Sequence, residues 1–67
     1  LNNKPEKILS VEQMLKLQEI LQSMGYDVGK VDGILGRKTR QSVRSIQIKL
    51  GFPADSWPTA DLFNILN

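Results

Sequence analysis

The sequence predicts an all-α fold, a small three-helix bundle with a long ordered loop between its first two helices. Two segments with helical periodicity carry apolar residues spaced three and four apart, at about 11–24 and 37–50. A stretch rich in glycine and aspartate separates them, and a short third apolar segment ends the chain. With 67 residues, the chain is long enough for one domain only.

The first helix is expected over residues 11–24. Ser10 and Gln13 fit a Ser-x-x-Gln capping box, in which each side chain satisfies a backbone N–H group at the helix start. Leu9 and Met14 are spaced to form the hydrophobic staple that often accompanies such a box. The helix therefore has a well-defined start.

Gly25 is expected to close this helix, because a left-handed glycine commonly follows the last helical turn. The residues spaced to form its buried face are Met14, Leu17, Leu21 and Met24, with Ile20 at the shoulder. Val11 and Leu15 lie off this face. Joined by Ile8 or Leu9, they would form an apolar patch suited to a neighbouring domain.

The segment from residue 25 to residue 39 is longer than most helix connections and carries its own packing side chains, which is typical of a functional loop. Asp27 and Asp32 can accept hydrogen bonds from nearby backbone N–H groups. Four glycines offer positive-φ or tight-turn positions, namely Gly25, Gly29, Gly33 and Gly36. The loop is therefore expected to be a shaped, ligand-binding part of the molecule.

The second helix is expected over residues 37–50, closed by Gly51. Its buried face repeats at Thr39, Val43, Ile46 and Leu50, with Ser42 small enough to allow close approach. Its opposite face carries Arg37, Arg40 and Arg44.

Gln18 and Gln47 stand at the edges of the two buried faces, one in each helix. A half-buried glutamine can satisfy loop backbone groups that would otherwise lack a partner, and this is the role expected for both. The alternative is that both are ordinary surface residues.

A short third helix is expected from Pro58 or Ala60 to Leu66, with Thr59 as a possible N-cap. Its buried residues are expected to be Leu62, Phe63 and Leu66. The segment before it echoes the one before the second helix: Asp55 leads to Thr59 much as Asp32 leads to Thr39. One Asp-based turn that ends at a helix start is therefore expected twice.

The composition excludes several function classes. The chain has no cysteine and no histidine, which rules out disulfides, Cys/His zinc sites and Ser-His-Asp catalysis. A glycosidase would need two facing carboxyls, but Asp27, Asp32 and Asp55 lie in turn contexts that favour ionised, hydrogen-bonded forms. No catalytic residue, metal or cofactor is expected. No apolar run approaches the length of a membrane span.

An ordered series of residues resembles the type 1 peptidoglycan-binding domain over about residues 11–66. It comprises Leu17-Gln18-x-x-Leu21-x-x-Met24-Gly25-Tyr26, Gly29-x-x-Asp32-Gly33-x-x-Gly36-x-x-Thr39, and Ser42-Val43-x-x-Ile46-Gln47-x-x-x-Gly51-Phe52 followed by Asp55. The ending from Gly51 to Leu62 is similar to the C-terminal module of B-type lytic murein transglycosylases. Ile46 and Arg37 stand where many members have phenylalanine and proline.

This resemblance implies a peptidoglycan-binding domain over residues 10–67, preceded by a linker or tail over residues 1–9. It implies a monomer of the bacterial cell envelope or periplasm that binds peptidoglycan and is covalently linked to an upstream catalytic domain. The same fold resembles metalloprotease propeptides, but those inhibit through a cysteine that this chain lacks.

The residues expected to contact the ligand combine loop, cationic and aromatic groups: Tyr26, Asp32, Gly33, Arg37, Lys38, Arg40 and Trp57. Those expected to be structural are Gln18, Gly25, Gly36, Thr39, Gln47 and Asp55. A carboxylate docked at the start of the second helix would relieve its local cationic charge. Alternatively, Arg37 and Lys38 are solvated charges and Trp57 covers the core. Asp32 would then only accept hydrogen bonds within its own turn.

Two other functions stay open. A bracing domain for an enzyme would use the off-face residues Val11 and Leu15. A DNA-binding domain would use the basic stripe of the second helix. A helix-turn-helix needs a turn of about three or four residues, however, and the connection here is much longer. A net charge of +2 is also low for nucleic-acid binding.

Overall fold

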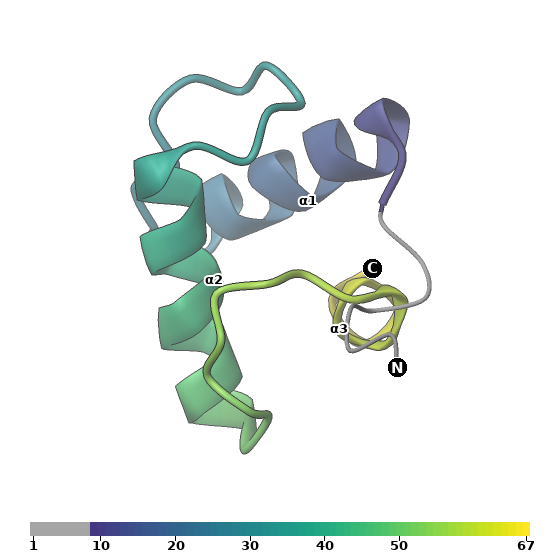
Figure 1. Cartoon of the computed structure of the whole chain (residues 1–67). Coiled ribbons are helices and arrows are strands. Elements are labelled where there is room, and N and C mark those ends of the chain that lie inside the picture. The colour runs from purple at the N-terminus through teal and green to yellow at the C-terminus, as the bar shows by residue number, and fades with distance from the viewer. Residues whose placement is uncertain (1–8) are drawn as a thin grey trace, which may run out of the picture.

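A computed structural model describes residues 9–67 of the chain. It contains three helices in this range, α1 (Val11–Ser23), α2 (Arg37–Leu50) and α3 (Ala60–Leu66), and no strand among the described residues (Figure 1). The all-helical prediction is therefore confirmed. The expected tail lies outside the described residues except for Leu9, and so does Ile8.

The start of α1 has the predicted capping box. The Ser10 hydroxyl accepts a hydrogen bond from the backbone N–H of Gln13 at 3.1 Å, and the Gln13 side chain accepts one from the backbone N–H of Ser10 at 2.9 Å. Leu9 and Met14 are both buried in the core, as the staple requires. Because Leu9 is buried, it does not join Val11 in an exposed patch.

The end of α1 differs from the prediction. The helix stops at Ser23, and Met24 is its C-cap, with a side chain that is 45% exposed. Gly25, at φ 98°, turns the chain so that the backbone N–H of Tyr26 reaches the carbonyl of Leu21 at 3.0 Å. In this Schellman arrangement the residue after the glycine, Tyr26, packs against the core, whereas Met24 stays at the exposed helix end, so the expectation that Met24 belongs to the core is wrong.

The end of α2 repeats this arrangement. Gly51 has φ 81°, and the backbone N–H of Phe52 donates to the carbonyl of Gln47 at 2.8 Å. Leu50 precedes the glycine as Met24 does, and its side chain is 40% exposed, so the expectation that Leu50 is buried is wrong for the same reason. The predicted bounds of α2 are confirmed.

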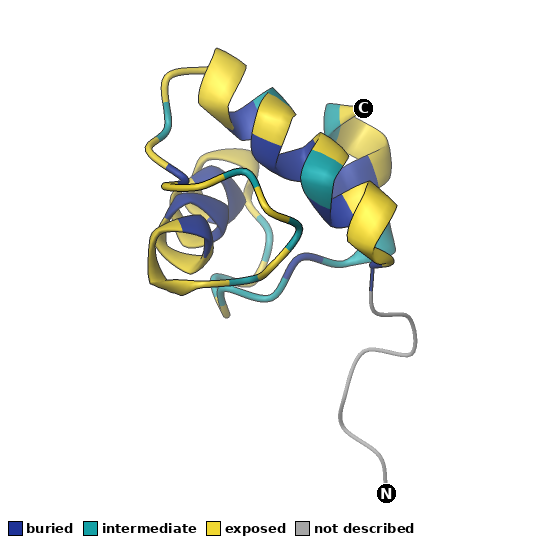
Figure 2. Ribbon diagram, turned by 90° about the horizontal axis from the view of Figure 1, so that it is seen from above, coloured by how far each residue is buried: buried dark blue, intermediate teal, exposed yellow. Residues whose placement is uncertain are grey.

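α3 begins at Ala60 rather than Pro58, because Thr59 is the N-cap and its hydroxyl accepts from the N–H of Leu62 at 3.2 Å. α3 packs against α1. Figure 2 shows that the buried sides of the helices face one another. The core consists of Leu9, Met14, Leu17, Leu21, Val28, Val43, Ile46, Leu62 and Phe63. Leu66 is partly buried against this core.

Candidate functional site

The loop between α1 and α2 folds back along α1 (Figure 1) and is fixed there by Gln18, whose side chain is fully buried. Its oxygen accepts hydrogen bonds from the backbone N–H groups of Asp32 at 3.1 Å and Gly33 at 2.8 Å. Its nitrogen donates to the carbonyl of Ile34 and to the hydroxyl of Thr39, both at 3.0 Å. The predicted role of Gln18 in satisfying loop backbone groups is thus confirmed.

Gln47 does the same for the connection between α2 and α3. Its oxygen accepts from the backbone N–H of Ser56 at 2.9 Å. Its nitrogen donates to the carboxylate of Asp55 and to the carbonyl of Trp57, both at 3.0 Å. In both glutamines the oxygen and the nitrogen of the side-chain amide are therefore hydrogen-bonded within the protein. This excludes the alternative that they are ordinary surface residues.

The two turns held by these glutamines share one geometry. The carboxylate of Asp32 accepts from the N–H of Ile34, and that of Asp55 accepts from the N–H of Trp57, each at 2.9 Å. In both turns the residue that follows the aspartate has a left-handed backbone conformation: Gly33 has φ 78° and Ser56 has φ 66°. The predicted echo is therefore confirmed, with Ser56 at the position that glycine occupies in the first turn.

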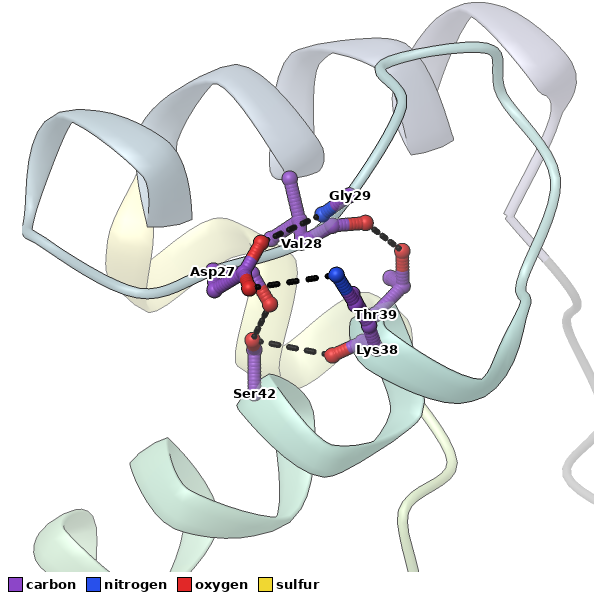
Figure 3. A network of polar contacts seen from close by, with 6 residues as sticks. All are labelled: Asp27, Val28, Gly29, Lys38, Thr39 and Ser42. Carbon is purple, nitrogen blue, oxygen red and sulfur yellow. Dashed lines mark hydrogen bonds and ion pairs between the residues drawn. The ribbon is translucent and has the colours of Figure 1, made fainter.

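A second set of polar contacts joins the loop to the first turns of α2 (Figure 3). The hydroxyl of Thr39 donates to the carbonyl of Val28 at 3.1 Å, deep in the protein. The hydroxyl of Ser42 lies 2.9 Å from the carbonyl of Asp27 and 3.0 Å from that of Lys38. The sequence suggested only that Ser42 permits close approach, since its bond to a distant loop carbonyl leaves no local pattern.

Asp27 adds an ionic contact at the surface. Its carboxylate accepts from the N–H of Gly29 at 3.0 Å and lies 3.4 Å from the ammonium of Lys38. The Gly29 N–H, and after it the positive charge of Lys38, lower the pKa of Asp27 below its ordinary value. Both charged side chains are largely exposed, so the pair orients the loop more than it stabilises the fold.

Two hollows flank the N-terminus of α2. The first, of about 430 Å³, is called the arginine hollow here. It is lined by Leu35, Gly36, Arg37, Arg40, Gln41, Arg44 and Ser56, and no acidic side chain is among these residues. The guanidinium of Arg44 also donates to the carbonyl of Ala54 at 2.7 Å, which ties the second connection to α2.

The second hollow, of about 420 Å³, is called the loop hollow here. It is lined by Val28, Gly29, Lys30, Asp32, Ile34, Gly36, Arg37, Lys38 and Thr39. Gly36 and Arg37 line both hollows. Gly36 is the N-cap of α2 and offers no side-chain cap, so the start of this helix is left open to other partners.

The structure brings together four of the seven residues expected to contact a ligand. Arg37 and Arg40 line the arginine hollow, and Asp32 and Lys38, with Arg37, line the loop hollow. Asp32 also serves its own turn through the N–H of Ile34.

The other three expected contacts, Tyr26, Gly33 and Trp57, line neither hollow. Tyr26 packs against the core. Trp57 is half-buried, and among the described residues its buried indole nitrogen has no hydrogen-bond partner.

Sequence reasoning missed Gln41 and Ser56 as lining residues, and it considered Arg44 only as part of a basic stripe. Neither Gln41 nor Ser56 carries a motif signal. The turn that brings Ser56 beside α2 depends on contacts with Gln47, which lies nine residues away in the chain.

The part of the chain that the structure describes has neither a metal-ligand cluster nor a membrane-spanning helix. In this part of the chain no three acidic, histidine or cysteine side chains are grouped so that they could hold a metal ion. None of its helices combines the length and apolar character needed to cross a membrane. What the site offers is cationic and amide side chains around two open hollows.

Comparison with known proteins identifies similar chains. Residues 10–66 match the family model PG_binding_1, described as a peptidoglycan binding domain. A spore cortex-lytic enzyme of Bacillus cereus is 41% identical over 46 residues, which cover 69% of this chain and 18% of the enzyme.

Two crystal structures of SltB3 from Pseudomonas aeruginosa are also similar. The complex with NAG-anhNAM-pentapeptide has a TM-score of 0.82 and 45% identity, covering 87% of this chain and 16% of SltB3. The complex with NAG-NAM-pentapeptide has a TM-score of 0.90 and 39% identity, covering all of this chain and 18% of SltB3. The chain thus spans less than a fifth of each of these relatives.

Proposed function

The chain belongs to the peptidoglycan-binding domain family, and we propose that it binds murein without catalysing a reaction and holds a linked cell-wall-degrading enzyme at its substrate. The named relatives support this proposal, because one is a spore cortex-lytic enzyme and the other was crystallised with peptidoglycan fragments. A module that covers 16–18% of such relatives leaves room for a catalytic domain elsewhere in the protein.

The observation that carries the proposal is the pair of hollows at the start of α2, which share Gly36 and Arg37. Gln18 and Thr39 hold the loop that forms one wall, so the surface is ordered before a ligand arrives. Pre-ordering lowers the entropy cost of binding. The proposed contacts here are Asp32, Arg37, Lys38 and Arg40.

We also propose contacts by the groups outside the hollows. Trp57 and Tyr26 offer aromatic rings that can stack on the apolar face of a sugar, and the backbone of Gly33 is a further proposed contact. The site is open and shallow, so the expected dissociation constant of the isolated chain is on the order of tens of micromolar to millimolar.

Linkage to an enzyme makes such weak binding useful. A tethered lytic transglycosylase would meet its polymer at a high effective concentration, without any tighter contact in the module itself. Membership of the family implies association with the cell envelope, and we propose the periplasm as the compartment and a monomer as the working form.

One observation favours a second function, bracing of an enzyme domain. Val11 and Ile34 are 63% and 65% exposed, and Val11 approaches Gly33, the chain neighbour of Ile34. Large apolar side chains that share a surface are suited to a partner domain. A bracing module would use this face, which meets the loop hollow at Ile34, and leave the arginine hollow free.

Sedimentation with insoluble murein sacculi tests the main proposal. We expect the chain to pellet with the sacculi, and the double variant R37Q/R40Q to remain largely in the supernatant. The matched control K16Q/K49Q removes the same charge from exposed positions outside both hollows and should pellet like the parent. Retention of the parent in the supernatant at high concentration would favour bracing, and steep salt-dependent binding to duplex DNA would favour the nucleic-acid alternative.

A further inference from the structure

The arginine hollow concentrates positive charge, and no acidic residue lines it. Arg37, Arg40 and Arg44 lie at the same side of α2 and all line it, and the remaining lining residues are uncharged. Arg44 is partly engaged by the carbonyl of Ala54. Like charges on one helix face repel one another, so an anion bound among the three arginines would reduce the electrostatic repulsion that exists in the free protein.

The type of cation indicates the type of anion. A guanidinium group presents a planar fork of N–H donors that matches a carboxylate in a bidentate way, and these charge-assisted hydrogen bonds are stronger than neutral ones. Neutral sugar hydroxyls gain nothing comparable from a row of arginines. The hollow is thus better suited to a carboxylate than to uncharged glycan.

Ser56 provides a separate observation. It has φ 66° in a turn whose counterpart holds glycine at φ 78°, so a side chain is present where glycine would fit with less strain. Among the described residues, Ser56 makes its hydrogen bond through the backbone N–H, to Gln47. Ser56 lines the arginine hollow, and its hydroxyl can act as donor or acceptor.

We infer that the arginine hollow binds a free carboxylate of the peptidoglycan stem peptide. Arg37 and Arg40 contact the carboxylate, and the hydroxyl of Ser56 hydrogen-bonds the adjoining peptide group. That the carboxylate belongs to peptidoglycan rests on the proposed function. That the hollow prefers a carboxylate rests on its three arginines. The stem peptide, rather than the sugar chain, is then what this hollow recognises.

Titration of the ¹⁵N-labelled chain, followed by amide shifts, tests this inference with three probes. A disaccharide-tetrapeptide with free carboxyls should shift the amides of Gly36, Arg37 and Ser56. The same muropeptide with its carboxyls amidated, and chitotetraose, which has no carboxyl, should shift them at least about tenfold more weakly, as expected for loss of a charge-assisted contact. Equal binding of the amidated probe at these amides would overturn the inference.

Variants test the individual residues. Arg40→Gln should weaken binding of the free-carboxyl probe about tenfold, whereas Lys49→Gln, in the last turn of the same helix, should leave it unchanged. Raising the salt concentration should weaken binding to the parent more than to R40Q. An unchanged affinity in R40Q would count against the assignment.

Ser56→Gly separates a structural role from a ligand contact. Relief of the left-handed strain should raise the melting temperature, while loss of the hydroxyl should weaken probe binding about threefold, as for one ordinary hydrogen bond. A more stable variant with parental affinity would show that the hydroxyl has no part in recognition. The sacculus assay keeps the two proposals apart, because binding of amidated sacculi would refute carboxylate recognition alone, while failure to bind any sacculi would refute the proposed function.

Discussion

The side-chain amide of Gln18 on α1 donates a hydrogen bond to the hydroxyl of Thr39 on α2, over 3.0 Å. Both side chains are essentially inaccessible to solvent. The Thr39 hydroxyl in turn donates to the carbonyl of Val28 at 3.1 Å, so one chain of hydrogen bonds joins α1, α2 and the loop between them. The walls of the loop hollow are held in place by this buried contact.

Replacing Gln18 should therefore be costly. In Gln18→Met the volume is nearly kept, but two backbone N–H groups and one carbonyl lose their partner, and the Thr39 hydroxyl keeps only its bond to Val28. Each unsatisfied buried group costs about 1–3 kcal/mol, so the free energy of unfolding should fall by about 3 kcal/mol or more. Urea denaturation measures this loss, and Gln22→Met, an exposed position on the same helix, should change stability by less than about 0.5 kcal/mol.

Gly33 should tolerate no side chain. It has φ 78°, and a Cβ atom there would lie 2.7 Å from Cγ1 of Val11 and 3.3 Å from its carbonyl oxygen. Gly33→Ala should lower the free energy of unfolding by about 2 kcal/mol or more, from backbone strain plus overpacking. Gly25→Ala is the control for strain alone, since Gly25 has φ 98° but open space around its Cβ position, and about 1 kcal/mol is expected. Equal losses would mean that the loop yields to the contact with Val11.

The exposed helix ends should accept charge. Met24→Lys should change the free energy of unfolding by less than about 0.5 kcal/mol, because the side chain is 45% exposed and a cation suits a helix C-terminus. By contrast, Leu21→Ala, three residues earlier and fully buried, should cost about 2–5 kcal/mol. Thermal unfolding of both variants checks the placement of Met24 outside the core.

The carboxyl of Asp27 should titrate below its ordinary pKa. Because the folded-state value is lowered, the ionised carboxylate favours the folded state above pH 3.8, and this contribution is lost as pH falls through the lowered folded pKa. Lys38→Gln should raise the pKa of Asp27 only part of the way, since the Gly29 N–H is the larger cause and remains. Carbon-detected NMR titration measures both values. A full return to 3.8 in K38Q would show that the lysine alone sets the shift.

The local signals in the sequence were sufficient for most of the fold. Ser10 and Gln13 marked the start of α1, and Gly51 marked the end of α2, because caps depend on residues within one helical turn. The same local view placed Met24 and Leu50 in the core, since the three-four spacing continues through them. In the structure the residues after the two glycines, Tyr26 and Phe52, pack against the core, and Met24 and Leu50 stay exposed.

The candidate site could be predicted only in part. Arg37, Lys38 and Arg40 were identified because charge at a helix start is visible in the sequence. Ser56 and Gln41 were not, because the arginine hollow arises where the second connection returns to the side of α2, through the bonds of Gln47 and Arg44.

The sequence by itself determined the helices, their caps and the two Asp-based turns, since each depends on neighbours a few residues apart. Only the tertiary structure decided that the side-chain amides of Gln18 and Gln47 are hydrogen-bonded inside the protein, and that Ser56 lines one hollow with three arginines. These relationships join residues 8–21 positions apart, and the chain must fold before hydrogen bonds of that span can form.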